Sequence, residues 1–246
     1  MIEKQVDIKT RAGSSDTFVC YPERGGPHPA VIFYMDAPGL REELYDMARR
    51  IASVGYYVIL PNLYYRTGRG ALLTAEATIH ESPEQKKMFG LMATISNTKI
   101  GEDSEGFIQF LDAQSEVKKS PFGAIGYCMS GPYVMVAAAM HPDRFGAAVS
   151  LHGVPFVTDL ADSAHLMMDK IKAEAYFGFG ATDVLTPQSD IDVLAAKLKT
   201  TKLKYELEMY ENCGHGFVFP QRALYNKPGA ERHWERSFAL FKRTIG

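Results

Sequence analysis

The sequence has few of the features that would place it at once in a special class of protein. Its 246 residues contain three cysteines, and the net charge at pH 7 is −2. An odd, sparse set of cysteines argues against a disulfide framework and for a reducing compartment. A balanced charge argues against nucleic acid or an acidic membrane surface as the main partner.

Long apolar runs are also missing. The most apolar helix-like run, residues 131–140, is about half as long as a membrane-spanning helix. The first ten residues lack the apolar core of a signal peptide. We therefore expect a soluble, cytoplasmic protein with no membrane partner.

Linkers and metal-ligand clusters are absent as well. No stretch is rich enough in proline, glycine or serine to divide the chain, so we expect one domain over residues 1–246. Cys213 and His215 lie close together, but no second ligand pair stands near them in the sequence, so no metal site is expected.

What is present is an alternation of short apolar runs with amphipathic segments. This pattern predicts an α/β fold with a mostly parallel sheet of about eight strands and helices on both faces. The predicted strands cover residues 3–10, 16–22, 29–36, 56–61, 122–127, 146–153, 173–180 and 204–211. The predicted helices cover residues 41–54, 100–114, 129–141, 187–200 and 229–245, with a further short helix between 66 and 97.

The segment GYCMSG, residues 126–131, has the pattern of a nucleophile elbow. Such a turn leads from a strand into a helix with the nucleophile at a strained apex. The residues two before and two after the apex must be small, as Gly126 and Ser130 are. Cys128 would then project at the carboxyl edge of the sheet, where a helix N-terminus favours a thiolate.

Two later loops supply the partners that a nucleophilic cysteine needs. Asp183 follows a predicted strand, and His215 lies between two glycines after the last strand. The order nucleophile, acid, histidine is the one expected for this fold class. We expect His215 to deprotonate Cys128 and Asp183 to hold the imidazole, so that the sulfur attacks a carbonyl carbon.

Simpler explanations exist for each residue. Cys128 could be a buried core thiol, Asp183 the cap of the helix after Pro187, and His215 a surface loop residue. Ser130 is a rival nucleophile, but its own frame lacks the second small residue. Another histidine, His152, ends a strand and is a secondary candidate for lining the site.

These segments together resemble the dienelactone hydrolase (carboxymethylenebutenolidase) family of the α/β-hydrolase superfamily. The resemblance runs from about Val19 to the last helix. It is carried by GYCMSG, by GATD around Asp183, by GHGF around His215, and by PNLYYR and VIFYMDAPG at residues 61–66 and 31–39. It implies an α/β-hydrolase fold without a large cap, no cofactor, and hydrolysis of a lactone through an acyl-cysteine.

The resemblance also implies roles for residues outside the triad. The N–H groups of Met129 and Ala37 would form an oxyanion hole. Arg66 would hold a substrate carboxylate, since a guanidinium binds a carboxylate through two hydrogen bonds. Asp36 stands where the family usually has glutamate.

The sequence departs from the family at a second anion-binding arginine. That position is Phe219 here, with Arg222 and Arg41 as substitutes, and Phe217 and Phe219 suggest an apolar wall. We expect a hydrolase of small esters or lactones, with or without a carboxylate, acting as a monomer or small homo-oligomer. The alternatives are a thioesterase or other acyl hydrolase on the same site, and a hydrolase fold used only for binding.

Overall fold

The computed structural model describes all residues 1–246, which form two compact units, Met1–Ser120 and Pro121–Gly246. Each unit carries four strands of the chain's eight and is described by itself. The prediction of one domain over 1–246 stays a prediction.

The first unit is a hairpin followed by two parallel strands, in the order β1–β2–β4–β3. β1 pairs antiparallel with β2, β2 antiparallel with β4, and β3 parallel with β4. The strands are β1 (Ile2–Thr10), β2 (Gly13–Tyr21), β3 (Ala30–Tyr34) and β4 (Tyr57–Pro61). The helices are α1 (Glu42–Ser53), the short 3₁₀ helix η1 (Ala75–Thr78), α2 (Pro83–Met92) and α3 (Asn97–Asp112).

Local features of the sequence explain where α1 ends and where α3 begins. α1 buries the predicted apolar stripe and stops before Gly55, whose φ of +109° suits glycine. α3 begins three residues earlier than predicted because the Ser96 hydroxyl accepts the N–H of Lys99. The weak pattern of residues 66–97 resolves into η1 and α2, where one short helix was predicted.

The second unit is a parallel sheet in the order β5–β6–β7–β8. Its strands are β5 (Phe122–Tyr127), β6 (Phe145–Leu151), β7 (Glu174–Gly180) and β8 (Tyr205–Tyr210). Its helices are α4 (Ser130–Met140), the 3₁₀ helix η2 (Ala164–Lys170), α5 (Gln188–Lys199) and α6 (Lys227–Thr244). Of these, only η2 was not predicted.

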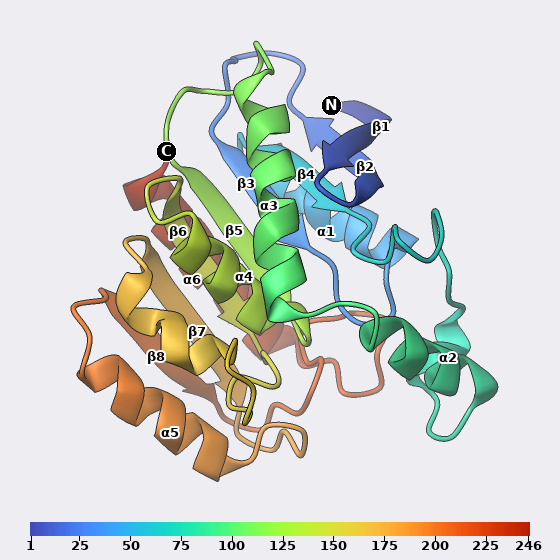
Figure 1. Ribbon diagram of the computed structural model, residues 1–246, viewed down its shortest axis with the longest axis vertical. Helices are drawn as coiled ribbons and strands as arrows, with labels where there is room; N and C mark the ends of the chain where they lie inside the picture. The colour runs from blue at the N-terminus through green and yellow to red at the C-terminus, as the bar shows by residue number, and fades with distance from the viewer. The chain divides into compact units, whose positions relative to one another are not determined.

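Glycines on β5 show which helix covers each face of this sheet. A Cβ at Gly123 would lie 2.9 Å from Ile245, just past α6, whereas one at Gly126 would lie 2.3 Å from the carbonyl oxygen of Ser130 in α4. Residues an odd number of positions apart on a strand face opposite sides of the sheet, and Gly123 and Gly126 are three positions apart. α6 and α4 therefore cover opposite faces (Figure 1). Because the four strands are parallel, the loops that follow them gather at one edge.

No helix in the structure combines the length and the apolar character needed to cross a membrane.

Candidate active site

Cys128 sits at the sharp turn between β5 and α4. Its φ is +54°, a left-handed conformation that is uncommon outside glycine. The turn is closed by two backbone bonds: the Cys128 N–H donates to Leu151 O (3.1 Å), and the Gly131 N–H donates to Cys128 O (3.1 Å). Gly126 leaves no room for a side chain, since an added Cβ would meet Ser130 O at 2.3 Å. The small residue two before the cysteine therefore has a steric cause.

Cys128 is also the more accessible of the two candidate nucleophiles in the turn. It is half-buried, whereas Ser130, its rival, is wholly buried. Cys20 and Cys213 are buried too, and burial raises the pKa of both thiols, that of Cys20 to about 12. A reagent that attacks thiolates should therefore select Cys128.

Asp183 and His215 come from the loops after β7 and β8 and meet there. Asp183 Oδ2 lies 2.8 Å from His215 Nδ1. The Asp183 carboxylate is fully buried and its Oδ1 accepts the N–H of Leu185 (2.9 Å), which fixes its orientation. It does not cap α5, whose N-cap is Pro187 with no side-chain bond. The alternative that Asp183 caps the helix after Pro187 is therefore wrong.

The imidazole of His215 interacts with Cys128 as well as with Asp183. Burial alone would lower the pKa of His215. The hydrogen bond to Asp183, followed by the hydrogen bond and charge of Cys128, raises it to about 10. Nε2 is buried and has no well-aligned hydrogen bond. Cys128 therefore lies close enough to His215 to raise the pKa of the imidazole.

Two further residues lie close to Cys128. Nδ1 of His152 accepts the N–H of Cys128 at 3.2 Å, and the His152 ring is 4.9 Å from that of His215, centroid to centroid. Tyr133, one turn into α4, is half-buried, and burial together with the charge of Cys128 raises its pKa. In the sequence, His152 was a secondary candidate for lining the site, and Tyr133 was not singled out. The feature of the sequence that could have identified Tyr133 is its place five residues after Cys128, the candidate nucleophile.

The residues expected to form an oxyanion hole lie in different units. Met129 is the N-cap of α4 and is buried. Ala37 follows β3 in the first unit, and its carbonyl oxygen accepts the hydroxyl of Tyr64 (2.7 Å). The joint role of their N–H groups stays a prediction.

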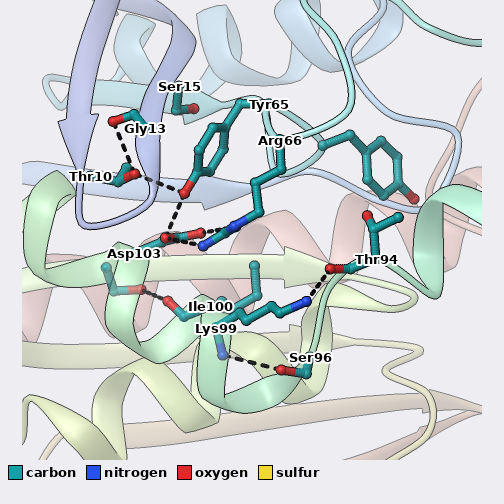
Figure 2. A network of polar contacts seen from close by, with 12 residues as sticks. Thr10, Gly13, Ser15, Tyr65, Arg66, Thr94, Ser96, Lys99, Ile100 and Asp103 are labelled. Carbon is teal, nitrogen blue, oxygen red and sulfur yellow. Dashed lines mark hydrogen bonds and ion pairs between the residues drawn. The ribbon is translucent and has the colours of Figure 1, made fainter.

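Arg66 is already engaged with a carboxylate of the protein. Its two terminal nitrogens donate to both oxygens of Asp103 at 2.7 and 2.8 Å, and Tyr65 donates to the same carboxylate at 2.8 Å. Figure 2 shows Arg66 and Tyr65 converging on Asp103, with Thr10 bonded to the Tyr65 hydroxyl. Asp103 is fully buried. The sequence feature that could have identified Asp103 is an acidic residue among the apolar positions of a predicted helix.

Arg41 is engaged in the same way. It donates to both oxygens of Asp36 (2.5 and 3.0 Å) and, through two nitrogens, to Glu43 (2.7 and 3.1 Å). Both carboxylates are buried. Substrate binding by Asp36 and Arg41 stays a prediction.

Phe217 and Phe219, which were expected to form an apolar wall, are packed in the protein core. Phe217 and Phe219 are almost wholly buried, and their rings pack 5.7 and 5.6 Å from that of His152. Arg222 lies over the Phe219 ring at 5.3 Å. The two phenylalanines therefore support the histidines, and contact between Phe217 and substrate stays a prediction.

Known proteins resemble this sequence over nearly the whole chain. A relative from Synechocystis sp., provisionally named a carboxymethylenebutenolidase, is 27% identical over 93% of this chain and 91% of its own length. A relative from Escherichia coli strain K12 with the same provisional name is 26% identical over 90% of this chain and 79% of its own.

Solved structures give the same fold. The crystal structure of a provisionally named dienelactone hydrolase from Klebsiella pneumoniae has a TM-score of 0.87 and 23% identity, covering 98% of each chain. The dienelactone hydrolase of Anabaena variabilis has a TM-score of 0.72 and 16% identity, covering 100% of this chain and 99% of that chain. The predicted α/β-hydrolase fold, mostly parallel and without a large cap, is confirmed.

The family profile itself matches residues 15–245, from β2 to the end of α6. That span includes the elbow at Cys128 and both loops that carry Asp183 and His215. The chain therefore belongs to the dienelactone hydrolase family.

Proposed function

We propose that this protein hydrolyses small carboxylic esters or lactones with Cys128 as nucleophile, His215 as base and Asp183 as its partner. The observation that carries the proposal is the 2.8 Å contact between Asp183 and His215, and the interaction of Cys128 with the same imidazole supports it. A carboxylate, an imidazole and a nucleophile in this order form the arrangement used for acyl transfer on several unrelated folds.

The proposed reaction has two halves. With the proton of Cys128 held by His215, Sγ attacks the carbonyl carbon to form a tetrahedral oxyanion. The N–H groups of Met129 and Ala37 are the proposed donors to that oxyanion. His215 returns the proton to the leaving alcohol oxygen as the C–O bond breaks, which leaves an acyl-cysteine.

The second half regenerates the enzyme. His215 takes a proton from water, the hydroxide attacks the acyl carbon, and Sγ of Cys128 leaves with the proton that His215 returns. For a lactone, the released alcohol and acid belong to one molecule. Asp183 stays ionised throughout and stabilises the imidazolium. No step calls for a cofactor.

The charges around the arginines favour substrates without a carboxylate. Arg66 and Arg41, the expected anion clamps, already donate to buried carboxylates of the protein. A substrate carboxylate would have to displace Asp103 or Asp36 and leave a buried charge unpaired, which is strongly unfavourable. We therefore propose neutral esters and lactones as the substrate class.

The side chains nearest the triad loops agree with this choice. Val184 and Leu185 follow Asp183 and are 89% and 53% exposed. Leu224 is 57% exposed and lies beside Gly214, the residue before His215, since a Cβ added at Gly214 would lie 3.1 Å from it. Exposed apolar side chains beside the acid and the base suit an apolar acyl or alcohol group.

A matched pair of substrates tests the function and the charge preference together. Para-nitrophenyl hexanoate and the mono-para-nitrophenyl ester of adipic acid have similar chains, but only the second ends in a carboxylate. We expect kcat/KM to be at least about tenfold higher for the neutral ester, a difference of about 1.4 kcal/mol. Preference for the charged ester would overturn the charge argument alone, while no turnover of either would count against the triad.

A thioester and a lactone of matched acyl size complete the panel. Thioester hydrolysis is the second acyl chemistry that the same acyl-cysteine would support. A kcat/KM for the thioester far above those of the oxygen ester and the lactone would reassign the protein as a thioesterase. If none of the compounds acylates Cys128, the fold serves binding alone.

A further inference from the structure

His152 occupies the position next to Cys128 across the parallel ladder. β5 and β6 pair with Tyr127 opposite Leu151, so the residues that follow, Cys128 and His152, leave the sheet side by side. Both have a positive φ, +54° for Cys128 and +39° for His152. Histidine is among the few side chains that enter this region with some frequency. Each of these two adjacent strands is thus followed by a residue with a positive φ.

The contacts between the two turns run in both directions. The Cys128 N–H is shared between Leu151 O at 3.1 Å and His152 Nδ1 at 3.2 Å. In return, Cys128 O accepts the N–H of Val154 at 3.1 Å. The His152 N–H donates to Gly178 O of β7 at 2.7 Å, which anchors the second turn to the next strand. Both backbone polar groups of Cys128, its N–H and its carbonyl oxygen, therefore form hydrogen bonds with the loop that begins at His152.

These contacts determine where the proton of His152 resides. Because Nδ1 accepts a hydrogen bond, the neutral ring carries its proton on Nε2. The side chain is wholly buried, and burial, followed by the charges of His215, His233 and Arg222, lowers the pKa of His152 well below 6.5. Its Nε2 has no hydrogen-bond partner and lies in an aromatic environment formed by His215, Phe217 and Phe219.

The catalytic imidazole rests against this ring. The two ring planes are inclined at 69°, an edge-to-face contact that restricts rotation of His215 about its side-chain bonds. One neutral side chain thus contacts the backbone of the nucleophile and the ring of the base at once.

We propose that His152 is a positioning residue that fixes Cys128 and His215 relative to each other and stays neutral so that His215 is the only imidazole that gains a proton there. The inference rests on the proposed function, since it takes Cys128 as nucleophile and His215 as its base. It predicts that the reaction depends on the hydrogen-bond acceptor at position 152 and not on a charge there.

Two substitutions of nearly equal shape separate these possibilities. In His152→Asn the amide oxygen reaches the place of Nδ1 and asparagine tolerates a positive φ, whereas His152→Leu has methyl groups there and no acceptor. We expect His152→Leu to lower kcat by roughly 10- to 100-fold with KM little changed, because the reacting groups are misplaced. His152→Asn should recover most of that loss. Thermal melting of both variants checks that they fold.

Alkylation of Cys128 by iodoacetamide gives a readout that a purely structural role would leave unchanged. At about pH 6 a free thiol is mostly protonated and reacts slowly. The wild type should react much faster than its His215→Ala variant at this pH, and His152→Leu should lose most of that advantage while His152→Asn keeps it. If wild type and His215→Ala react alike, the proposed triad fails. If they differ but His152→Leu behaves as wild type, only the role of His152 fails.

A measurement on the wild type covers the case in which the variants do not fold. With ¹⁵N-labelled histidine, the side-chain nitrogen signals of His152 should report a neutral ring protonated on Nε2 across the pH range of activity. A ring protonated on Nδ1, or one that becomes charged together with His215, would overturn the proposal.

Discussion

At the scale of single residues, the proposed chemistry depends on the imidazole of His215, which contacts the carboxylate of Asp183 and interacts with Cys128. The sequence predicted these partners from their order and from the loops that carry them. It could not predict the distances, because these depend on how the loops after β7 and β8 fold back. Nor could it predict that Arg66 is paired with Asp103, since that pairing depends on which face of α3 packs inward.

Asp183→Asn should leave the fold intact and remove most of the activity. The amide would hold the imidazole in the wrong tautomer, so kcat should fall by roughly 1,000-fold or more. Steady-state kinetics on a para-nitrophenyl ester measures the loss. Asp192→Asn on the exposed side of α5 is the control and should keep wild-type kcat. Near-normal activity in Asp183→Asn would remove this carboxylate from the mechanism.

The raised pKa of His215 makes a prediction about stability and pH. A folded-state pKa of about 10 against an ordinary value of 6.5 means that the folded state binds this proton more tightly. The stabilisation is therefore fully present below about pH 6.5 and is lost as the pH rises through about 10. Urea unfolding of wild type and His215→Gln should show a stability difference that shrinks over this range. A difference that grows with pH would contradict the assignment.

At the scale of elements, the elbow depends on the close approach of β5 and α4. A Cβ at Gly126 would lie 2.3 Å from Ser130 O and 2.7 Å from Val134 Cγ2, so backbone would have to move. We expect Gly126→Ala to lower the free energy of unfolding by about 1–3 kcal/mol and to displace Cys128. Gly90→Ala in α2 meets nothing within 4 Å and should be neutral or mildly stabilising. Chemical denaturation of both variants compares them, and equal stability would contradict this account of the turn.

The elements also show what sequence reasoning can reach. The ranges of the strands were predictable because buried parallel strands are continuous apolar runs. The helix η2 was not, since residues 164–170 have no amphipathic repeat long enough to identify. The hydrogen bond between Cys128 and His152 could not be predicted for a different reason. It depends on the register between β5 and β6, which the sequence of one strand alone does not determine.

At the scale of the whole molecule, the family match runs without a break over residues 15–245. The chain passes from the first compact unit to the second between Ser120 and Pro121, with no linker residues. Fold class could be predicted from the alternation of strands and helices, because that alternation has few solutions. The division into two units could not, since no shift of composition marks it.

We predict that the chain unfolds as one cooperative body. A single calorimetric transition, with equal calorimetric and van't Hoff enthalpies, is the expected result. Two resolved transitions would show that the units Met1–Ser120 and Pro121–Gly246 are independent domains.

The central claim is that the sulfur of Cys128 becomes covalently attached to the acyl group of the substrate. Intact-protein mass spectrometry after brief exposure to para-nitrophenyl hexanoate and acid quenching tests it most directly. We predict a mass increase of one acyl group, mapped to the peptide that contains Cys128 and absent from Cys128→Ala, which should also be inactive. Hydrolysis by Cys128→Ala at the wild-type rate, or an adduct on another residue, would contradict the account.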